Sequence, residues 1–543
     1  MHAAANLRIL RPGWNQAPTN DLQFTFVMAI QYGVDLLCGS HIEVRRQRLT
    51  IDRPCIKLPF NLRTVGYRYI SSAHPLSVPP PSSDAVPRSR AWPRQTPAAN
   101  APRRISVPSQ AMSQQMWPAP TADRPIRGTV VVPGSKSITN RALVLAAIST
   151  RSCTISNLLV ARDSSLMIDA LRELGTQVEQ VSATSVRITP HSLHGPARID
   201  CGLAGTLMRF LPPLAATADG DIKFDGDEGA RRRPMATTIE SLRALGVAVS
   251  DNGTHALPFT VHGDGIVPGG DVSLDASTSS QFVSGLLLAS PRFENGITVR
   301  HRGNSVPSLP HIEMTVAMLR AAGADVHFQA SDPTNASWTV TPGTINLGDY
   351  VIEPDLSNAA AFLAAAMVTA GSVTIPDWPS DTTQAGDQIR DVFTAMGGSC
   401  VRDPAGLTVT GPQELAGIDI DLRDIGELTP TIAAVAVFAT TPSTLRGVAH
   451  LRGHETDRLA ALVTEINRLG GHAEELPDGL RITPAPLSAA DVASYHDHRM
   501  ATFGAIIGLR VPGTRVENIG TTAKTMPEFA AMWSQLVGQA GSP

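Results

Sequence analysis

From Pro118 onward, two kinds of apolar segment alternate along the chain. Segments of the first kind, such as DALRELG at 169–175, keep a charged stripe beside apolar positions at helical spacing, which is typical of a half-exposed helix. Segments of the second kind, such as RALVLAAI at 141–148 and AAAFLAAAMV at 359–368, are apolar on every side and predict buried helices. Short β-type segments such as SVRIT and SWTVTP lie between them. The pattern predicts an α/β protein whose units each hold one central helix, one peripheral helix and several strands.

This pattern repeats with a period of about 75 residues. The copies LRELGTQV, LRALGVAV, LRAAGADV, FTAMGGSC and INRLGGHA share a glycine at a spacing of about 70–77 residues, and a weaker sixth copy ends at Gly538. Each glycine stands where a helix needs a left-handed residue before the chain turns into a strand. Six units of this size predict two pseudo-symmetric domains of three repeats each. The shared glycines are Gly175, Gly246, Gly323, Gly397 and Gly470.

Residues 1–112 differ from the rest in composition. Their second half is rich in Pro, Ser, Ala and Arg, and such a segment cannot bury enough apolar surface to offset its ordering entropy. We expect a disordered N-terminal extension. Two alternatives stay open: a basic Pro-rich tail that binds a partner, or sequence upstream of a true start at Met112 or Met116. The apolar patch at 24–38 contains polar residues and lacks a small-residue cleavage site, which argues against a secretory signal.

Composition excludes several classes of protein. The net charge of −3 gives no global case for binding nucleic acid or a membrane surface. The five cysteines lie far apart without a C-x-x-C pair, which argues against a structural zinc site or a disulfide framework and fits a cytoplasmic protein. The longest uncharged run, 356–376, is mostly Ala and predicts a buried helix rather than a membrane span.

The stretch VVVPGSKSITNR at 130–141 ends a β-branched run in Pro-Gly and places Ser135, Lys136 and Ser137 before an apolar helix. Free backbone N–H groups and the positive end of the helix dipole suit an anion there. It is not a nucleotide P-loop, because Val130 and Ser135 occupy the two glycine positions of that motif.

Cations precede several other helices as well. A cation at a helix N-terminus opposes the helix dipole, so capping does not explain it and another partner is expected. If the helices of each domain run parallel, their N-termini meet on one face, and two such faces would enclose an electropositive cleft for a small molecule with several anionic groups. The cations are Lys136, Arg141, Arg233, Arg458, Arg499 and Lys524.

Seven motifs in order, PGSKSITNR, LAGTLMRF, GDEGARRRPM, SSQF, HETDR, DHRM and KTMPEF, closely resemble the EPSP synthase (3-phosphoshikimate 1-carboxyvinyltransferase) family over residues 118–538. The resemblance implies an inside-out α/β barrel of two domains with three repeats each. It also implies that the chain crosses between the domains twice, so that 118–133 plus 353–543 form one domain and 134–352 the other, with the active site in the cleft between them.

The resemblance further implies transfer of the enolpyruvyl group of phosphoenolpyruvate to the 5-hydroxyl of shikimate 3-phosphate, a step of the shikimate pathway towards chorismate and the aromatic amino acids. We expect these two small molecules as partners, no cofactor, no metal, a monomer in the cytoplasm, and glyphosate as the inhibitor that binds this site in the family. The residues expected to hold phosphoenolpyruvate are Lys136, Gly205, Arg233, Gln281, Arg458, Arg499 and Lys524. Those expected to hold shikimate 3-phosphate are Lys136, Ser137, Arg141, Ser279, Ser280, Gln281, Ser308, Glu427 and His454.

For catalysis, the resemblance makes Glu427 the candidate base for the 5-hydroxyl. It makes Glu455 and Lys524, beside Lys136, the candidates for proton transfer at carbon 3, and Asp497 and His498 are expected to orient Arg499. Outside this context, an acidic residue before a helix is ordinarily a complement to the helix dipole.

Two departures from the family pattern bear on affinity: His454 stands where many members have Lys, and Leu203 where many have Asn. Neither removes a group that does chemistry. One alternative is the enolpyruvyl transferase that uses UDP-N-acetylglucosamine, but its loop matching 227–234 carries a catalytic Cys that this chain lacks. Another is a non-catalytic anion-binding protein on the same scaffold, which would be expected to lose chemical residues such as Glu427 and Glu455 first.

Overall fold

The computed structural model describes residues 42–44, 47–49, 115–330 and 334–539. Residues 1–99 and 100–543 form two separate units. In the first unit, strands β1 (Ile42–Val44) and β2 (Gln47–Leu49) pair in antiparallel fashion. The remainder of the predicted extension at 1–112 lies outside the described residues.

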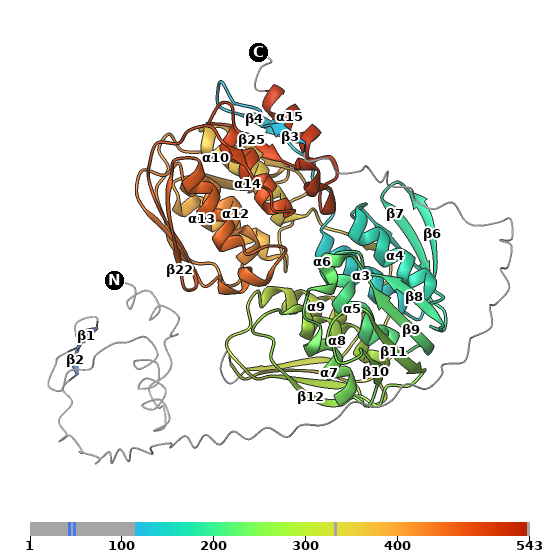
Figure 1. Ribbon diagram of the computed structural model, residues 1–543. Coiled ribbons are helices and arrows are strands. Elements are labelled where there is room, and N and C mark those ends of the chain that lie inside the picture. Colours follow the sequence, from blue (N-terminus) through green and yellow to red (C-terminus); the bar gives the residue numbers. More distant parts are fainter. Residues whose placement is uncertain (1–41, 45–46, 50–114, 331–333, 540–543) are drawn as a thin grey trace, which may run out of the picture. The chain divides into compact units, whose positions relative to one another are not determined.

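The described residues of the second unit form six mixed sheets, five of four strands and one of three. All six share one plan: an edge strand runs parallel to its neighbour, and the next pairing is antiparallel. This common plan confirms the six repeats predicted from the sequence, and Figure 1 shows the sheets along the chain.

Three sheets are built from the first part of this unit. Their strands are β16 (Tyr350–Val351), β5 (Cys153–Ser156), β7 (Ser185–Thr189) and β6 (Gln177–Ser182); β10 (Ala248–Ser250), β11 (Phe259–Asp264), β9 (Asp219–Asp225) and β8 (Ala197–Asp200); and β12 (Gly270–Leu274), β13 (Ile297–His301), β15 (Ala336–Val340) and β14 (Val326–Ala330).

The other three sheets use the ends of the unit. Their strands are β18 (Ser399–Asp403), β19 (Gly406–Thr410), β17 (Ser372–Ile375) and β4 (Arg127–Thr129); β20 (Asp419–Asp421), β21 (Ser443–Arg446), β23 (Gly479–Thr483) and β22 (His472–Leu476); and β24 (Asp491–Val492), β25 (Arg515–Glu517) and β3 (Met116–Pro118). Figure 1 draws β3 and β4, in blue, beside the red C-terminal helix α15 (Phe529–Gln539).

Two strands are exchanged between these groups of sheets. β4 runs parallel to β17, although β17 comes more than two hundred residues later, and β16 runs parallel to β5. The two connecting segments also meet in an isolated antiparallel bridge between Gly134 and Pro354. The chain therefore passes from one group of sheets to the other twice, and both passages lie side by side.

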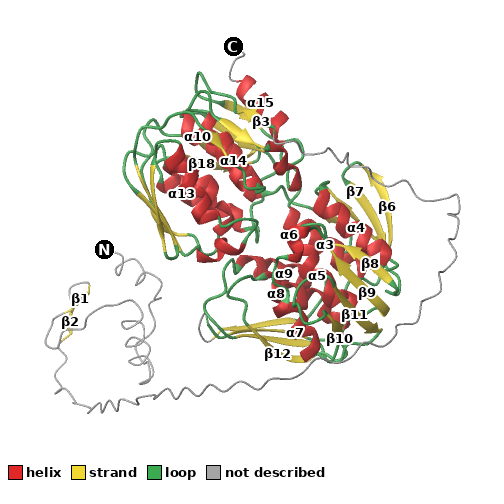
Figure 2. Cartoon of the chain, viewed as in Figure 1, coloured by secondary structure: helices red, strands yellow, loops and turns green. Residues whose placement is uncertain are grey.

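Figure 2 shows helices packed with these sheets, and their burial divides them into two kinds, as the apolar pattern predicts. The central helices are buried along almost their whole length: α3 (Lys136–Ala147), α5 (Gly205–Ala215), α8 (Gln281–Ala289), α10 (Leu356–Thr369), α12 (Thr429–Ala436) and α14 (His498–Gly508). The peripheral helices, α15 among them, bury one face: α4 (Arg162–Glu173), α7 (Ala236–Ala244), α9 (Pro310–Ala321), α11 (Ile389–Ala395) and α13 (Arg458–Arg468).

Short helical turns lie between these elements: α6 (Glu228–Arg231), η2 (Ser290–Arg292), η3 (Ala385–Gln388), η4 (Gly426–Leu428), η5 (Ala449–Gly453) and η6 (Ile519–Lys524). The five repeat glycines predicted to end the peripheral helices all adopt a positive φ, between 84° and 98°. Gly175 follows the last turn of α4 in this way, and only a residue without Cβ adopts this conformation at no steric cost.

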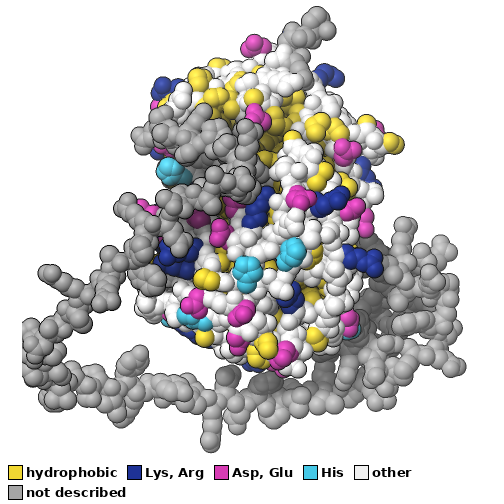
Figure 3. Space-filling model, turned by 90° about the vertical axis from the view of Figure 1, so that its right-hand side faces the viewer, with side chains coloured by type: hydrophobic (Ala, Val, Ile, Leu, Met, Phe, Trp, Pro, Cys, Tyr) yellow, Lys and Arg dark blue, Asp and Glu magenta, His cyan; other side chains and the backbone are white. Residues whose placement is uncertain are grey.

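The buried apolar side chains of this unit form two large clusters. The first core runs from Ile138 to Ile352, and the second core joins Ile126, Val130 and Val132 to the residues from Leu356 to Leu536. The uncharged run at 356–376 becomes α10 followed by β17, so the predicted buried helix is confirmed. Among the described residues, we find no helix with the length and apolar character needed to cross a bilayer. On the face drawn in Figure 3, basic and acidic side chains are interspersed, in keeping with the nearly balanced net charge.

Candidate active site

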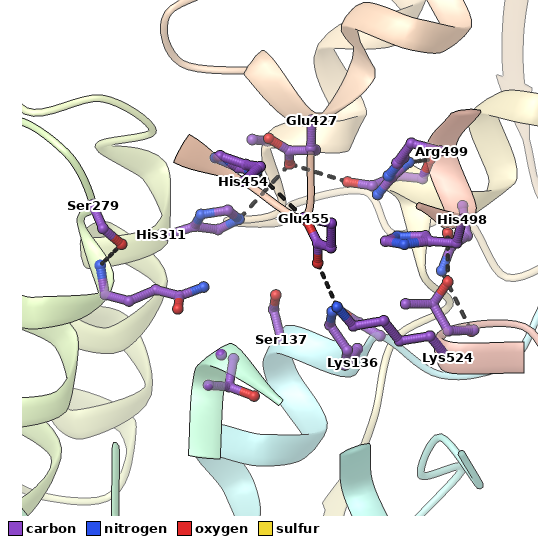
Figure 4. Close-up of a pocket in the computed structure, with 18 of the residues that line it drawn as sticks. Lys136, Ser137, Ser279, His311, Glu427, His454, Glu455, His498, Arg499 and Lys524 are labelled. Atoms are coloured by element: carbon purple, nitrogen blue, oxygen red, sulfur yellow. Dashed lines mark hydrogen bonds and ion pairs between the residues drawn. The ribbon is translucent and has the colours of Figure 1, made fainter. Parts of the chain in front are cut away.

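The N-termini of helices from both cores line one pocket (Figure 4). Helices α3, α5 and α8 of the first core contribute their first residues, Lys136, Gly205 and Gln281. Helices α13 and α14 of the second core contribute Arg458 and Arg499 from their first two positions. The convergence inferred from the sequence is therefore present, and backbone N–H groups and positive dipole ends face a common space.

Most of the predicted site residues lie in this pocket lining. They are Lys136, Ser137, Gly205, Arg233, Ser279, Gln281, Glu427, His454, Glu455, Arg458, Arg499 and Lys524. Three predicted residues lie outside the lining: Arg141, Ser280 and Ser308.

The Pro-Gly turn before α3 places Lys136 in the pocket lining. A Cβ on Gly134 would lie 1.9 Å from the backbone oxygen of Asn157, so only glycine allows this close approach. The backbone N–H of Lys136 donates to Oδ2 of Asp355 at 3.1 Å, and its Nζ lies 3.9 Å from the buried carboxylate of Asp163. Burial, together with the charge of Lys524, lowers the pKa of Lys136 below its ordinary value.

Arg141 lies behind the lining rather than in it. Its guanidinium is buried and donates to the backbone oxygens of Ser137 at 2.9 Å and His311 at 2.8 Å, and to Oγ1 of Thr315 at 2.7 Å. Burial lowers the pKa of Arg141 to about 9. In this structure Arg141 supports two pocket residues, and its contact with a substrate stays a prediction.

Ser280 and Ser308 also stand back from the pocket. Ser280 is buried and precedes α8, whereas its neighbour Ser279 lines the pocket and accepts a hydrogen bond from the backbone N–H of Gln281. Ser308 precedes α9 with a positive φ of 51°, and its N–H donates to the backbone oxygen of Arg423 at 2.9 Å.

Two arginines of the first core flank Gly205. A Cβ at this position would lie 2.9 Å from Nη1 of Arg209 and 3.0 Å from Nη1 of Arg233, so glycine makes room for both guanidinium groups. Nη1 of Arg233 and Nε of Arg209 are buried and have no hydrogen-bond partner among the described residues. Burial, with the nearby charge of Arg233, lowers the pKa of Arg209 to about 9. Unsatisfied donors of this kind are suited to receive an anion.

The second core presents a connected network of opposite charges instead. Arg458 donates from Nε to Oδ2 of Asp497 at 2.7 Å and from Nη2 to Oε2 of Glu455 at 3.2 Å, and Glu455 also pairs with Nζ of Lys524. Burial alone would raise the pKa of Glu455, but Lys524 and Arg458 outweigh it and hold the pKa well below its ordinary value. Glu455 is therefore an ionised carboxylate in a buried site.

Glu427 stands in the turn η4, in front of α12. Its Oε1 accepts a hydrogen bond from Oγ of Ser357 at 3.2 Å and lies 3.7 Å from Nε2 of His311. Burial acts to raise the pKa of Glu427, but His311 and Arg499 bring it below its ordinary value. The result is an ionised carboxylate facing the pocket, which is the state that a general base needs.

Asp497 and His498 differ in part from the expectation that they orient Arg499. The side chain of Asp497 caps α14 through the backbone N–H of Arg499 at 2.8 Å, and it also accepts two hydrogen bonds from the guanidinium of Arg458. The guanidinium of Arg499 donates to the backbone oxygen of Ser357 at 2.7 Å. His498 lines the pocket, and burial lowers its pKa well below the ordinary value.

Several lining residues were not among the predicted site residues. Most of them lie in polar segments at the starts of helices, such as LAGTLMR at 203–209, SLPH at 308–311 and PDLSN at 354–358, in which nothing singles out one side chain. Gln384 carried no signal, because it lies in a turn between elements. The missed residues include Thr206, Arg209, Thr278, His311, Asp355, Ser357 and Gln384.

Comparisons with known proteins place this chain in a family. A model of the family EPSP synthase (3-phosphoshikimate 1-carboxyvinyltransferase) matches residues 120–533. The 3-phosphoshikimate 1-carboxyvinyltransferase of Kocuria rhizophila is 53% identical over 437 residues, which cover 78% of this chain and 97% of that protein. The chain belongs to the EPSP synthase family.

Solved structures agree on the fold of this family. An EPSP synthase structure from Acinetobacter baumannii matches with a TM-score of 0.66 and 24% identity, covering 79% of this chain and 98% of that one. The enolpyruvyl transferase NikO of Streptomyces tendae matches with a TM-score of 0.61 and 16% identity, covering 78% of this chain and 98% of that one. At such identities the likeness concerns the fold, and it confirms the predicted enolpyruvyl transferase architecture.

Proposed function

We propose that this chain transfers the enolpyruvyl group of phosphoenolpyruvate to the 5-hydroxyl of shikimate 3-phosphate, releasing phosphate in the shikimate pathway. The observation that carries the proposal is the 53% identity to the Kocuria rhizophila 3-phosphoshikimate 1-carboxyvinyltransferase over nearly the whole of that protein. The pocket supports it, because cations and helix N-termini from both cores meet there and each substrate carries a carboxylate and a phosphate.

Phosphoenolpyruvate binds, in this proposal, between two sides of the pocket. The unpaired guanidinium of Arg233 and the backbone of Gly205 form one side, and the N-termini of α3 and α13 form the other. An arginine fork can bond a carboxylate or phosphate at two points, which suits a small dianion better than a point charge does. The residues that hold this substrate are Lys136, Gly205, Arg233, Gln281, Arg458, Arg499 and Lys524.

Shikimate 3-phosphate binds beside it, against the starts of α3, α8 and η4. Ser279 and Ser280 offer hydroxyl and N–H donors to the phosphate, and Arg141 acts through Ser137, whose backbone it holds at 2.9 Å. The residues assigned to this substrate are Lys136, Ser137, Arg141, Ser279, Ser280, Gln281, Ser308, Glu427 and His454.

The proton steps belong to ionisable groups of the second core. Glu427 removes the proton of the 5-hydroxyl as its oxygen attacks carbon 2 of phosphoenolpyruvate. Glu455 and Lys524, which form a direct ion pair, deliver a proton to carbon 3 and take one back when phosphate leaves, with Lys136 beside them. The pocket cations stabilise the negative charge throughout.

The organisation of the chain follows the same proposal. Residues 118–133 plus 353–543 form one domain and 134–352 the other, with the pocket between them, and residues 1–112 are an extension that takes no part in catalysis. We expect a monomer in the cytoplasm, and glyphosate as an inhibitor at this site.

The test is phosphate release from phosphoenolpyruvate by the purified full chain, with shikimate 3-phosphate and UDP-N-acetylglucosamine offered separately. Release with shikimate 3-phosphate alone is the expected result. Release with the nucleotide sugar would assign the chain to the other enolpyruvyl transferase reaction. Release with neither, from a folded protein that binds both substrates, would leave an anion-binding scaffold without chemistry.

A further inference from the structure

His311 and Glu427 approach each other from different parts of the fold. His311 is the second residue of α9, which packs on the first core, and Glu427 stands in η4 on the second core. Nε2 of His311 lies 3.7 Å from Oε1 of Glu427, and both side chains are mostly buried, with 19% and 15% of their surface exposed. Figure 4 shows the imidazole turned towards the carboxylate at the edge of the pocket.

The position of His311 is fixed through its backbone. Its carbonyl oxygen accepts hydrogen bonds from Nη2 of Arg141 at 2.8 Å, Oγ1 of Thr315 at 3.0 Å and Oγ of Ser284 at 3.3 Å. Three donors on one oxygen, one of them charged, hold the first turn of α9 firmly in place. The backbone from which the imidazole extends towards Glu427 is therefore fixed.

The segment before α9 is also tied to the segment that carries Glu427. The N–H of Ser308 donates to the backbone oxygen of Arg423 at 2.9 Å. This contact joins the segment before α9 to the segment before η4, and it helps to hold His311 close to Glu427.

The protonation states of the two side chains favour proton transfer from Glu427 to His311. Burial lowers the pKa of His311 below its ordinary value, although the carboxylate of Glu427 acts to raise it. At neutral pH the imidazole is therefore neutral and the carboxylate is ionised, as described above. The charged and titratable groups that face this pair are Lys136, Arg141, Asp355, Asp424, His450, Arg458 and Arg499.

We propose that His311 is the positioning residue that receives, through Glu427, the proton of the 5-hydroxyl. The proposal rests on the proposed function, in which Glu427 is the base. The O–H bond of the substrate breaks as its oxygen forms the bond to carbon 2, and the proton passes to Oε1 of Glu427. It then passes to Nε2 of His311 and on to water, which restores the carboxylate, and no electron transfer takes place. The step requires Nε2 to be the unprotonated nitrogen beforehand, with the hydrogen on Nδ1.

The first variant to test is His311→Gln, whose amide keeps a polar group near Glu427 but cannot accept a proton. We expect kcat to fall by about 10- to 100-fold, at the lower end of general acid–base contributions, while KM for both substrates changes by less than about threefold. The acid limb of the kcat/KM profile should also move to lower pH. The reason is that the first proton added to the wild-type pair sits on the imidazole and blocks the transfer, whereas the variant loses its base only when Glu427 itself is protonated.

A control variant separates this effect from the general loss of a histidine. His262→Gln removes a partly exposed imidazole whose Nδ1 lies 2.7 Å from Oδ1 of Asp221, a histidine–carboxylate pair outside the pocket lining. We expect wild-type kcat and an unchanged pH profile for this control.

Chemical rescue gives a second measurement. His311→Ala opens space at the pocket edge, and added imidazoles should restore turnover with a rate that increases with their pKa. Wild-type kcat and pH profile in His311→Gln would overturn the proposal, and so would a loss confined to KM or a rescue that ignores the imidazole pKa. If Glu427→Gln itself kept the wild-type rate, the assignment of Glu427 as base would fail instead. A loss in Glu427→Gln without one in His311→Gln would reject only the inference about His311.

Discussion

Arg233 and Arg458 both line the pocket, but they are held in opposite ways. Arg458 is almost completely buried and bonded to Asp497 and Glu455, whereas Arg233 is half-buried and leaves Nη1 without a partner among the described residues. The contrast extends to their surroundings. The first core contributes hydroxyls, an amide and cations with few carboxylate partners, and the second core contributes an interlocked set of acids, bases and histidines.

This difference indicates that the two sides of the pocket have different roles. A charge that is already paired inside the protein holds neighbouring groups in fixed protonation states, as Lys524 and Arg458 do for Glu455. A charge that lacks a partner is completed by a ligand, so the unpaired cations of the first core are suited mainly to bind anions. The paired groups of the second core are suited mainly to move protons, with Lys136 and His311 as the first-core residues that take part in the proton steps.

The largest effect is expected for Arg458→Met. Removal of this guanidinium leaves the carboxylate of Asp497, which is fully buried, without its main partner. Breaking a buried ion pair on one side costs about 3–5 kcal/mol in the free energy of unfolding, and activity should be lost as well. The urea unfolding midpoint measures the loss. Arg515→Met, which breaks an exposed bidentate pair with Asp491, should leave the midpoint unchanged. An equal midpoint for both variants would contradict the structural role of Arg458.

A smaller and different effect is expected for Arg233→Gln. A charged hydrogen bond is worth roughly 1.5–3 kcal/mol, so KM for phosphoenolpyruvate should rise by about 10- to 100-fold. The unfolding midpoint should not fall, because the guanidinium has an unsatisfied donor in the free protein. Arg231→Gln, in the same loop but bonded to Asp225 at the surface, is the matched control and should keep the wild-type KM. A stability loss without a change in KM would assign Arg233 to the fold rather than to the ligand.

The smallest effect concerns the acid side of the stability profile. Burial lowers the pKa of His450 to about 4, with Arg458 and His311 adding to the shift and Glu427 opposing it; the ring of His454 also faces it. The unfolded chain binds a proton at this residue below about pH 6.5 and the folded chain only below about pH 4. The contribution of His450 to the free energy of unfolding is therefore fully present above about pH 6.5, and it is lost as the pH falls towards 4. His450→Gln should reduce the slope in this window by about one proton, or about 1.4 kcal/mol per pH unit. Unfolding midpoints between pH 7 and 4 measure it, and an unchanged slope would contradict the neutral buried state.

Much of the fold could be predicted from the sequence because its signals are local and repeated. The charged stripe in DALRELG and the uniformly apolar α10 distinguish peripheral from central helices, and Gly175 and its counterparts mark where helices end. The exchange of β4 and β16 between the two groups of sheets is not local. Only the family resemblance indicated it, because strand pairing over two hundred residues leaves no trace in a hydrophobic period.

The candidate site was predicted only in part, because some of its residues carry a local signal in the sequence and others do not. Lys136, Arg233 and Arg499 stand out because cations at helix N-termini oppose the local dipole. Arg141 shows the same signal, but its partners are the backbone oxygens of Ser137 and His311, and the sequence does not reveal which anion or carbonyl a cation will face. His311 could not be singled out, because its relation to Glu427 arises only when α9 docks beside η4.

The most direct test of these separate roles in binding and in proton transfer is a comparison of substrate affinity and turnover in Glu427→Gln. We expect the variant to bind shikimate 3-phosphate with nearly wild-type affinity, because the cations and hydroxyls of the first core are intact. Turnover should fall by roughly two to four orders of magnitude, as expected for loss of a general base. A variant that keeps the wild-type rate, or one that loses binding in proportion to turnover, would contradict the claim that the second core supplies the proton chemistry.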